Sequence, residues 1–306
     1  MRESPPVSRA AVPASHIALL VFFQVIWGGN FVVSKLALDE IPPLLFIALR
    51  FLAISLIVAP FIRWHPGQMR YVFAIAISGG AAHFGLMIQG LDMAGDIAPI
   101  AIAMQLGVPF VTLLSVLFLG ERLGIWRSSA LVVAFAGVML MGFDPGVFNY
   151  LGALALTTGA AFMWALSAMF MRKVQGVPVY DMQGWIAITT WPVLLVWSLA
   201  WEPAPLDALS QAGWIGWGGL AYTVIGVSLI GHAALYWIVQ RNEISSMAPL
   251  LLIAPVVGAL GGVLILGDTL TWRMVAGGIL TLAGVMIITW REGRLRRAQA
   301  AQDGSS

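Results

Sequence analysis

The sequence predicts an all-α integral membrane protein with ten transmembrane helices, arranged as two inverted five-helix repeats. Apolar residues make up 60% of the chain and charged residues only 10%, whereas a soluble domain carries roughly 25% charged residues. Ten apolar runs approach the length of about 20 residues that a helix needs to cross a bilayer. A short motif also occurs twice, at equivalent places in the two halves of the chain.

The apolar runs are separated by short loops rich in proline, glycine and charged residues, and no loop is long enough for a soluble domain. In the first half they lie near residues 17–35, 43–62, 71–91, 97–119 and 127–143, and in the second half near 150–171, 182–201, 214–239, 247–266 and 273–290. The first run contains Gln24 and Asn30 and follows a polar segment, which favours a retained span over a cleaved signal peptide.

The repeated motif divides the chain into two halves. LGERL at 119–123 recurs as LGDTL at 266–270, an offset of 147 residues. Each copy follows a proline in the preceding run, and an AGVM tetrapeptide follows each copy at the same distance. We therefore expect a tail at 1–16, a first repeat at 17–143, a second repeat at 144–290 and a tail at 291–306.

Cationic residues indicate how the chain lies in the membrane. If the N-terminus is cytoplasmic, thirteen Arg and Lys residues fall in cytoplasmic segments, and only Lys35 and Arg273 fall outside. This asymmetry predicts a multi-pass protein of a bacterial inner membrane with both termini in the cytoplasm. It also accounts for the pI of 9.2, so no nucleic-acid partner is needed. Five spans per half is an odd number, so the halves enter the membrane in opposite senses, as in transporters that work by alternating access.

Four segments carry a resemblance to a known family: 27–31 (WGGNF), 49–53 (LRFLA), 109–123 with Gly137, and 255–270 with Gly284. From about residue 17 to 290 the chain resembles the drug/metabolite transporter superfamily and its ten-span EamA-type exporters, and it is most similar to exporters of aromatic amino acids. The resemblance implies secondary efflux without ATP. Asp268 stands in the second copy of the motif where the first has Glu121.

Polar and aromatic side chains within the runs are candidates for contact with a substrate, because polar groups in hydrocarbon usually face a cavity or another helix. We expect substrate contacts from Trp27, Asn30, Phe31, His83, Gln105, Trp164, Ser167, His232 and Tyr236. Aromatic faces suit an apolar side chain, and the polar groups suit the ammonium and carboxylate of a zwitterion. An interhelical hydrogen bond is an equally open role for the two histidines. Ser228 shares a stripe with His232, at a step of four residues.

Other residues are expected to shape or gate the protein. These are Arg50, Pro109, Glu121, Pro255 and Asp268. We expect Arg50 to bond backbone carbonyls or close the outer end, in preference to clamping a substrate carboxylate. Because no carboxylate lies in the middle of a run, we expect transport without an obligatory coupling ion.

The function most consistent with these features is export of small metabolites, with aromatic or hydrophobic amino acids as the favoured class. No cysteine, Walker motif, catalytic triad or zinc spacing occurs, so we expect no enzyme activity, cofactor or metal. The expected partners are a small-molecule substrate and the lipid bilayer, with the chain acting as a monomer. The alternatives are an exporter of cationic drugs or of sugar or nucleoside derivatives, and a membrane enzyme or sensor without transport.

Overall fold

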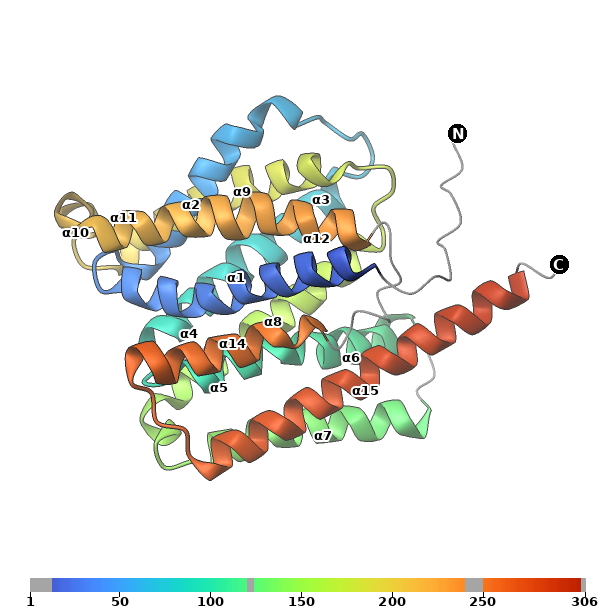
Figure 1. Cartoon of the computed structure of the whole chain (residues 1–306). Coiled ribbons are helices and arrows are strands. Elements are labelled where there is room, and N and C mark those ends of the chain that lie inside the picture. Colours follow the sequence, from blue (N-terminus) through green and yellow to red (C-terminus); the bar gives the residue numbers. More distant parts are fainter. Residues whose placement is uncertain (1–12, 120–123, 240–249, 304–306) are drawn as a thin grey trace.

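Long helices lie side by side in a single bundle (Figure 1). The computed structural model describes residues 13–119, 124–239 and 250–303, and these ranges contain helices and no β-strand. Within them nine helices are long and apolar enough to cross a membrane. A shorter apolar helix spans Ile253–Leu266, and the run predicted to contain it begins in residues outside the described ranges. The predicted all-α membrane fold is confirmed.

In the first half the helices are α1 (Ala14–Leu38), α2 (Pro43–Val58), η1 (Ala59–Phe61), α3 (Met69–Ile75), η2 (Ala76–Ala82), α4 (His83–Met93), α5 (Ile97–Ala103), η3 (Met104–Leu106), α6 (Gly107–Leu119) and α7 (Ile125–Gly142). In the second half they are η4 (Val147–Tyr150), α8 (Leu151–Met171), α9 (Val179–Trp201), α10 (Pro205–Gln211), α11 (Trp214–Ala221), η5 (Tyr222–Gly231), α12 (His232–Val239), α14 (Ile253–Gly261), η6 (Gly262–Leu266) and α15 (Trp272–Asp303).

Three of the spans change helix type near their middle. The segments η2 and η5 are π-helical, and each ends one residue before a histidine, His83 or His232. Wider π turns of this kind occur frequently at functional sites. In the fourth span, Pro109 has no N–H to donate to the Gln105 carbonyl four residues earlier. The helix tightens there into the 3₁₀ turn η3.

The last helix of each half packs antiparallel on the other, α7 on α15 (Figure 1). A Cβ added to Gly137 would lie 2.5 Å from the Gly277 carbonyl oxygen, and one added to Gly284 would lie 2.6 Å from the Ala130 carbonyl oxygen. The repeat offset of 147 residues relates Gly137 to Gly284 and Ala130 to Gly277. Each of these two contacts is therefore the repeat equivalent of the other. At the centre, the Thr281 hydroxyl donates to the carbonyl oxygen of Ala134 (3.3 Å), its own equivalent position. Such reciprocal contacts are what a two-fold relation between the helices produces.

The two ends of the bundle differ in charge. The loops 39–42, 94–96, 143–146, 202–213 and 267–271 form one end, at the left of Figure 1, which we name the acidic end because it carries Glu40, Asp96, Asp144, Glu202 and Asp268. The opposite end is formed by the loops 62–68 and 172–178 and by the first turns of α1 and α7 and the distal part of α15. We name it the basic end because it carries Arg63, Arg70, Arg127, Arg172, Lys173 and Arg291.

Candidate substrate site between the two halves

Arg50 lies at the junction of the two halves. It projects from α2, and only 2% of its surface is exposed. Its Nε donates a hydrogen bond to the Ser228 hydroxyl of η5 in the second half (3.0 Å). The guanidinium carbon lies 5.1 Å from the centre of the Phe84 ring, a cation–π distance. Among the described residues Arg50 forms no hydrogen bond to a backbone carbonyl, and its expected role in closing the outer end stays a prediction.

The charge of Arg50 has no counter-ion in the part of the chain that the structure describes. The ion pair found there joins His65 to Asp181, at the basic end. An arginine at the centre of a membrane helix costs about 2.5–3.5 kcal/mol on insertion scales. Such residues usually pair or face a substrate path, which makes the surroundings of Arg50 the first candidate for a functional site.

His83 is held next to this guanidinium by a bond to the second half. Its Nδ1 lies 2.8 Å from the Ala160 carbonyl oxygen of α8. A carbonyl only accepts, so Nδ1 must carry the hydrogen, and Nε2 is the nitrogen left to meet a ligand. The His83 ring also stacks edge-on against Phe84 at 4.7 Å. The interhelical hydrogen bond considered for His83 is therefore present, and its contact with substrate stays a prediction.

The aromatic candidates pack across the boundary between the halves. From α1, the Trp27 indole donates to the Val227 carbonyl oxygen of η5 (3.4 Å). The Phe31 ring, also on α1, packs on Gly258 of α14, 3.1 Å from the position that a Cβ on this glycine would take. From α8, the Trp164 ring lies 2.8 Å from the position of a Cβ on Gly107 in α6, and the side chain is 45% exposed. Trp27 and Phe31 thus contact the second half, and Trp164 contacts the first.

The remaining polar candidates are more dispersed. Gln105 is half-buried in η3, and its amide has no hydrogen-bond partner among the described residues. Ser167 is buried against Gly79 of η2, and the Asn30 amide oxygen accepts a long bond from Ser34 (3.5 Å). Within the described ranges, none of these candidates forms a hydrogen bond with Arg50 or His83. The side chains of His232 and Tyr236, and the whole of Glu121, lie outside the described residues.

The described residues among those expected to shape the protein occupy helix interiors and the acidic end. Pro109 and Pro255 are buried within α6 and α14. Asp268 accepts a hydrogen bond from the Ile97 N–H at the start of α5 (2.7 Å), which links the second half to the first. Burial raises the pKa of the Asp268 carboxyl above its ordinary value, although the Ile97 hydrogen bond opposes that shift.

Sequence reasoning missed two parts of the central group. Phe84 carried no polar signal, although it lies next to His83. Ser228 was noticed only for its stripe, because its partner Arg50 is 178 residues away. The ion pair of His65 and Asp181 was missed as well. The run predicted at 182–201 left Asp181 in the preceding loop, but α9 begins at Val179, directly after the N-cap Pro178, and includes Asp181.

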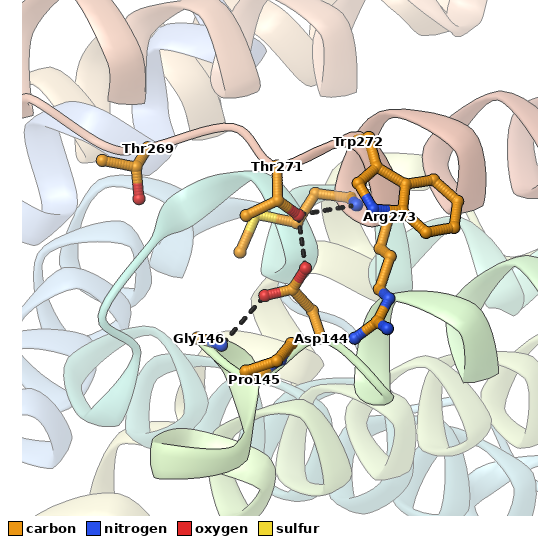
Figure 2. Close-up of a pocket in the computed structure, with 8 residues that line it drawn as sticks. Asp144, Pro145, Gly146, Thr269, Thr271, Trp272 and Arg273 are labelled. Atoms are coloured by element: carbon orange, nitrogen blue, oxygen red, sulfur yellow. Dashed lines mark hydrogen bonds between the residues drawn. The ribbon is translucent and has the colours of Figure 1, made fainter.

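A hollow of about 410 Å³ opens at the acidic end, between the loop 143–146 and the start of α15 (Figure 2). In Figure 2 the Asp144 carboxylate points to Thr271 and to the backbone of Gly146. The Thr271 hydroxyl and the Gly146 N–H (2.9 Å) both donate to it. Asp144 is thus engaged in holding this loop, and the hollow is lined by residues far in sequence from the Arg50 group.

Comparison with known proteins identifies the family. The model of the EamA-like transporter family matches residues 14–143 and, separately, residues 151–290. The chain belongs to this family. It is therefore a multi-pass membrane transporter. The repeated match falls on the two halves that the sequence motif separates.

Relatives and a solved structure agree with this assignment. A protein of Salmonella typhimurium (strain LT2) named "Probable amino-acid metabolite efflux pump" is 28% identical over 279 residues, covering 89% of this chain and 93% of its own. A protein of the same name from Escherichia coli (strain K12) is 25% identical, covering 90% and 96%. A solved crystal structure at 19% identity has a TM-score of 0.60 and covers 92% of this chain and 99% of its own, which supports the fold.

Proposed function

We propose that this protein exports amino acids or related metabolites, with aromatic and hydrophobic side chains favoured, from the cytoplasm of a bacterium. The observation that carries the proposal is the group of the buried Arg50, His83 and Ser228 with the partly buried Phe84. This group is built from both halves and combines hydrogen-bonding donors with an aromatic face. The names of the two relatives, given above, point to the same class of substrate.

We further propose that the halves, 17–143 and 144–290, are inverted repeats that work by alternating access. Antiparallel packing of α7 on α15 at equivalent positions supports an axis that lies in the plane of the membrane. The charges at the two ends support the orientation: by the positive-inside rule the basic end faces the cytoplasm and the acidic end faces outward. A site between the halves is where such an axis places the substrate.

The charge of the central group separates this proposal from one alternative. A carrier for cationic drugs needs acceptors or a carboxylate at its site, whereas the ionised group buried here is the Arg50 guanidinium. A cationic substrate would be repelled at that point. Around the guanidinium we assign substrate contacts to His83 and to the aromatic residues Trp27, Phe31 and Trp164. Asn30, Gln105 and Ser167 supply further hydrogen-bonding groups along the path.

Transport in proteoliposomes tests the proposal. Purified protein is reconstituted, and uptake of the twenty labelled amino acids is measured against an internal pool of unlabelled compound, with an organic cation and a nucleoside for comparison. We expect exchange of aromatic and aliphatic amino acids that persists when proton and sodium gradients are collapsed. Exchange of the organic cation or the nucleoside alone would contradict the substrate class. Loss of all flux without a gradient would contradict transport without an obligatory ion.

A further inference from the structure

The second half provides an internal control for Arg50. Helices α2 and α9 both begin directly after an N-cap proline, Pro42 or Pro178. Counted from these prolines, the position equivalent to Arg50 is Ile186. The π segments η2 and η5 end directly before His83 and His232, so the position equivalent to Ser228 is Gly79.

The equivalent contact in the other half is apolar. Ile186 packs against η2, with its Cγ2 3.1 Å from the position of a Cβ on Gly80, next to Gly79. The fold therefore forms this helix contact from an aliphatic side chain and glycines. A guanidinium at the matching place is not required for packing, and a buried unpaired charge costs stability that an apolar side chain would not. The chain therefore carries a buried charge at a position where the other half has an apolar side chain.

The free donors of Arg50 define what it would bind. Its Nε is occupied by Ser228, but neither Nη nitrogen has a hydrogen-bond partner among the described residues. No described carboxylate forms an ion pair with Arg50. The guanidinium presents a planar fork of donors that matches the two oxygens of a carboxylate. Phe84 covers one side of the guanidinium, and His83 lies on the adjoining turn with Nδ1 already engaged.

We propose that Arg50 binds the carboxylate of the transported compound, and that the protein therefore moves substrates with a free carboxylate and rejects their neutral amides. The substrate supplies the counter-ion that the chain lacks, and Ser228 fixes the guanidinium in place. The inference rests on the proposed function, since the substrate reaches Arg50 when the two halves move relative to each other.

The test compares an acid with its amide. Wild-type protein in proteoliposomes is assayed for exchange of L-phenylalanine and L-leucine, and of the corresponding amino-acid amides. We expect the acids to be preferred by roughly 10- to 100-fold, the range that a hydrogen-bonded charged group contributes. Arg50→Met should remove this preference by slowing the acids, while Arg50→Lys should retain part of it. Ile186→Met, at the equivalent position, and Arg70→Met, at the exposed basic end, should leave the preference unchanged.

A thermal melt separates this role from a structural one. If Arg50 binds the substrate carboxylate and does not stabilise the fold, the Arg50→Met protein should melt at the wild-type temperature or above, because the substitution removes an unpaired buried charge. L-phenylalanine should raise the melting temperature of wild type and not of Arg50→Met. Equal transport of acids and amides by wild type, or an unchanged acid preference in Arg50→Met, would overturn this inference and leave the proposed function standing. A wild-type protein that moves neither acids nor amides would overturn both.

Discussion

The two ends of the bundle are held together by different chemistry. At the acidic end, carboxylates of one half accept hydrogen bonds from backbone N–H groups of the other half. Asp268 accepts from Ile97 (2.7 Å) and Asp96 from Thr269 (3.1 Å). Glu202 accepts from Leu44 (2.6 Å) and Glu40 from Gly216 (2.5 Å). Asp268, Glu202 and Glu40 each meet the first turns of a helix, where the dipole favours a negative charge.

At the basic end, the hydrogen bonds between the halves that the described residues form gather around the loops 62–68 and 172–178. Asp181 accepts the Arg63 N–H (3.0 Å) and pairs with His65 (2.7 Å), and Gln68 and Gln175 bond each other. On the other side, α1 and α12 are joined by aliphatic packing around Leu20 and Ile238 and by an edge-on contact of the His16 and Trp237 rings (5.0 Å between centroids). The comparison indicates that carboxylates bound to helix N-termini hold the acidic end closed in this structure, and the predictions below test that role.

The largest effect should come from removing a tie at the acidic end. The chain has no cysteine, so Ala98→Cys, buried at the start of α5, can report opening through reaction with an impermeant maleimide. A hydrogen bond to a charged group contributes about 1.5–3 kcal/mol, so Asp268→Ala should speed labelling by roughly tenfold or more. Asp207→Ala, an exposed carboxylate at the same end, is the control and should change nothing. Equal rates in wild type and Asp268→Ala would show that this tie does not keep the end closed.

The contact that connects the two ends should be sensitive to a single methyl group. Gly284→Ala would place a Cβ 2.6 Å from the Ala130 carbonyl oxygen, and overpacking of this kind costs about 1–3 kcal/mol. Gly218→Ala, where a Cβ meets nothing within 4 Å, should raise stability slightly through helix propensity. Melting temperatures in lipid nanodiscs should therefore move in opposite directions. A melting temperature for Gly284→Ala equal to that of wild type would mean that α7 and α15 do not pack this closely.

Between the two ends, the aromatic lining should tune selectivity by a smaller amount. If Trp164 stacks on the substrate, Trp164→Ala should slow exchange of phenylalanine more than that of alanine, by roughly 2- to 10-fold, since aromatic pairs contribute about 0.5–1.5 kcal/mol. Trp290→Ala, on the exposed side of α15, serves as the control. An unchanged phenylalanine-to-alanine ratio would assign Trp164 to packing against Gly107 alone.

The smallest expected effect is on pH dependence at the acidic end. Burial raises the pKa of Asp268 in the closed state, and opening exposes the carboxyl to water and returns its pKa toward the ordinary value. Because the closed state then binds the proton more tightly, acid favours closure. Labelling of Ala98→Cys, normalised to an exposed Asp207→Cys reporter, should slow as the pH falls into the window between the ordinary and raised pKa values. The same dependence in an Asp268→Asn background would assign it to another group.

The sequence predicted the helical membrane fold because hydrophobicity and length alone decide which segments can span a bilayer. It did not predict that α15 continues to Asp303, because that extension rests on helix-forming alanines and arginines and carries no apolar signal. The π segments before His83 and His232 were also unforeseen, since one extra residue in a turn leaves little trace in the periodicity.

The site was harder to predict than the fold. His83 was singled out because polar groups are costly in hydrocarbon, and Arg50 because it also matches the pattern of the family it resembles. The aromatic residues of α1 and α8 were singled out by their depth within the spans. The partners were out of reach: Ser228 and Ala160 meet these side chains only after distant spans have packed. The hydrogen bond from Arg50 goes to a serine hydroxyl and not to a backbone carbonyl, because its span packs against η5, where Ser228 is available.

Alternating access between two inverted halves is the central claim, and paired distance measurements test it most directly. Spin labels at Met93 and Leu270 would report the acidic end, and labels at Ser15 and Lys173 would report the basic end, all four positions being exposed. We predict that under turnover with a transported amino acid the acidic-end distance lengthens in the same population in which the basic-end distance shortens. Distances that lengthen together at both ends, or that stay fixed while transport proceeds, would contradict the account.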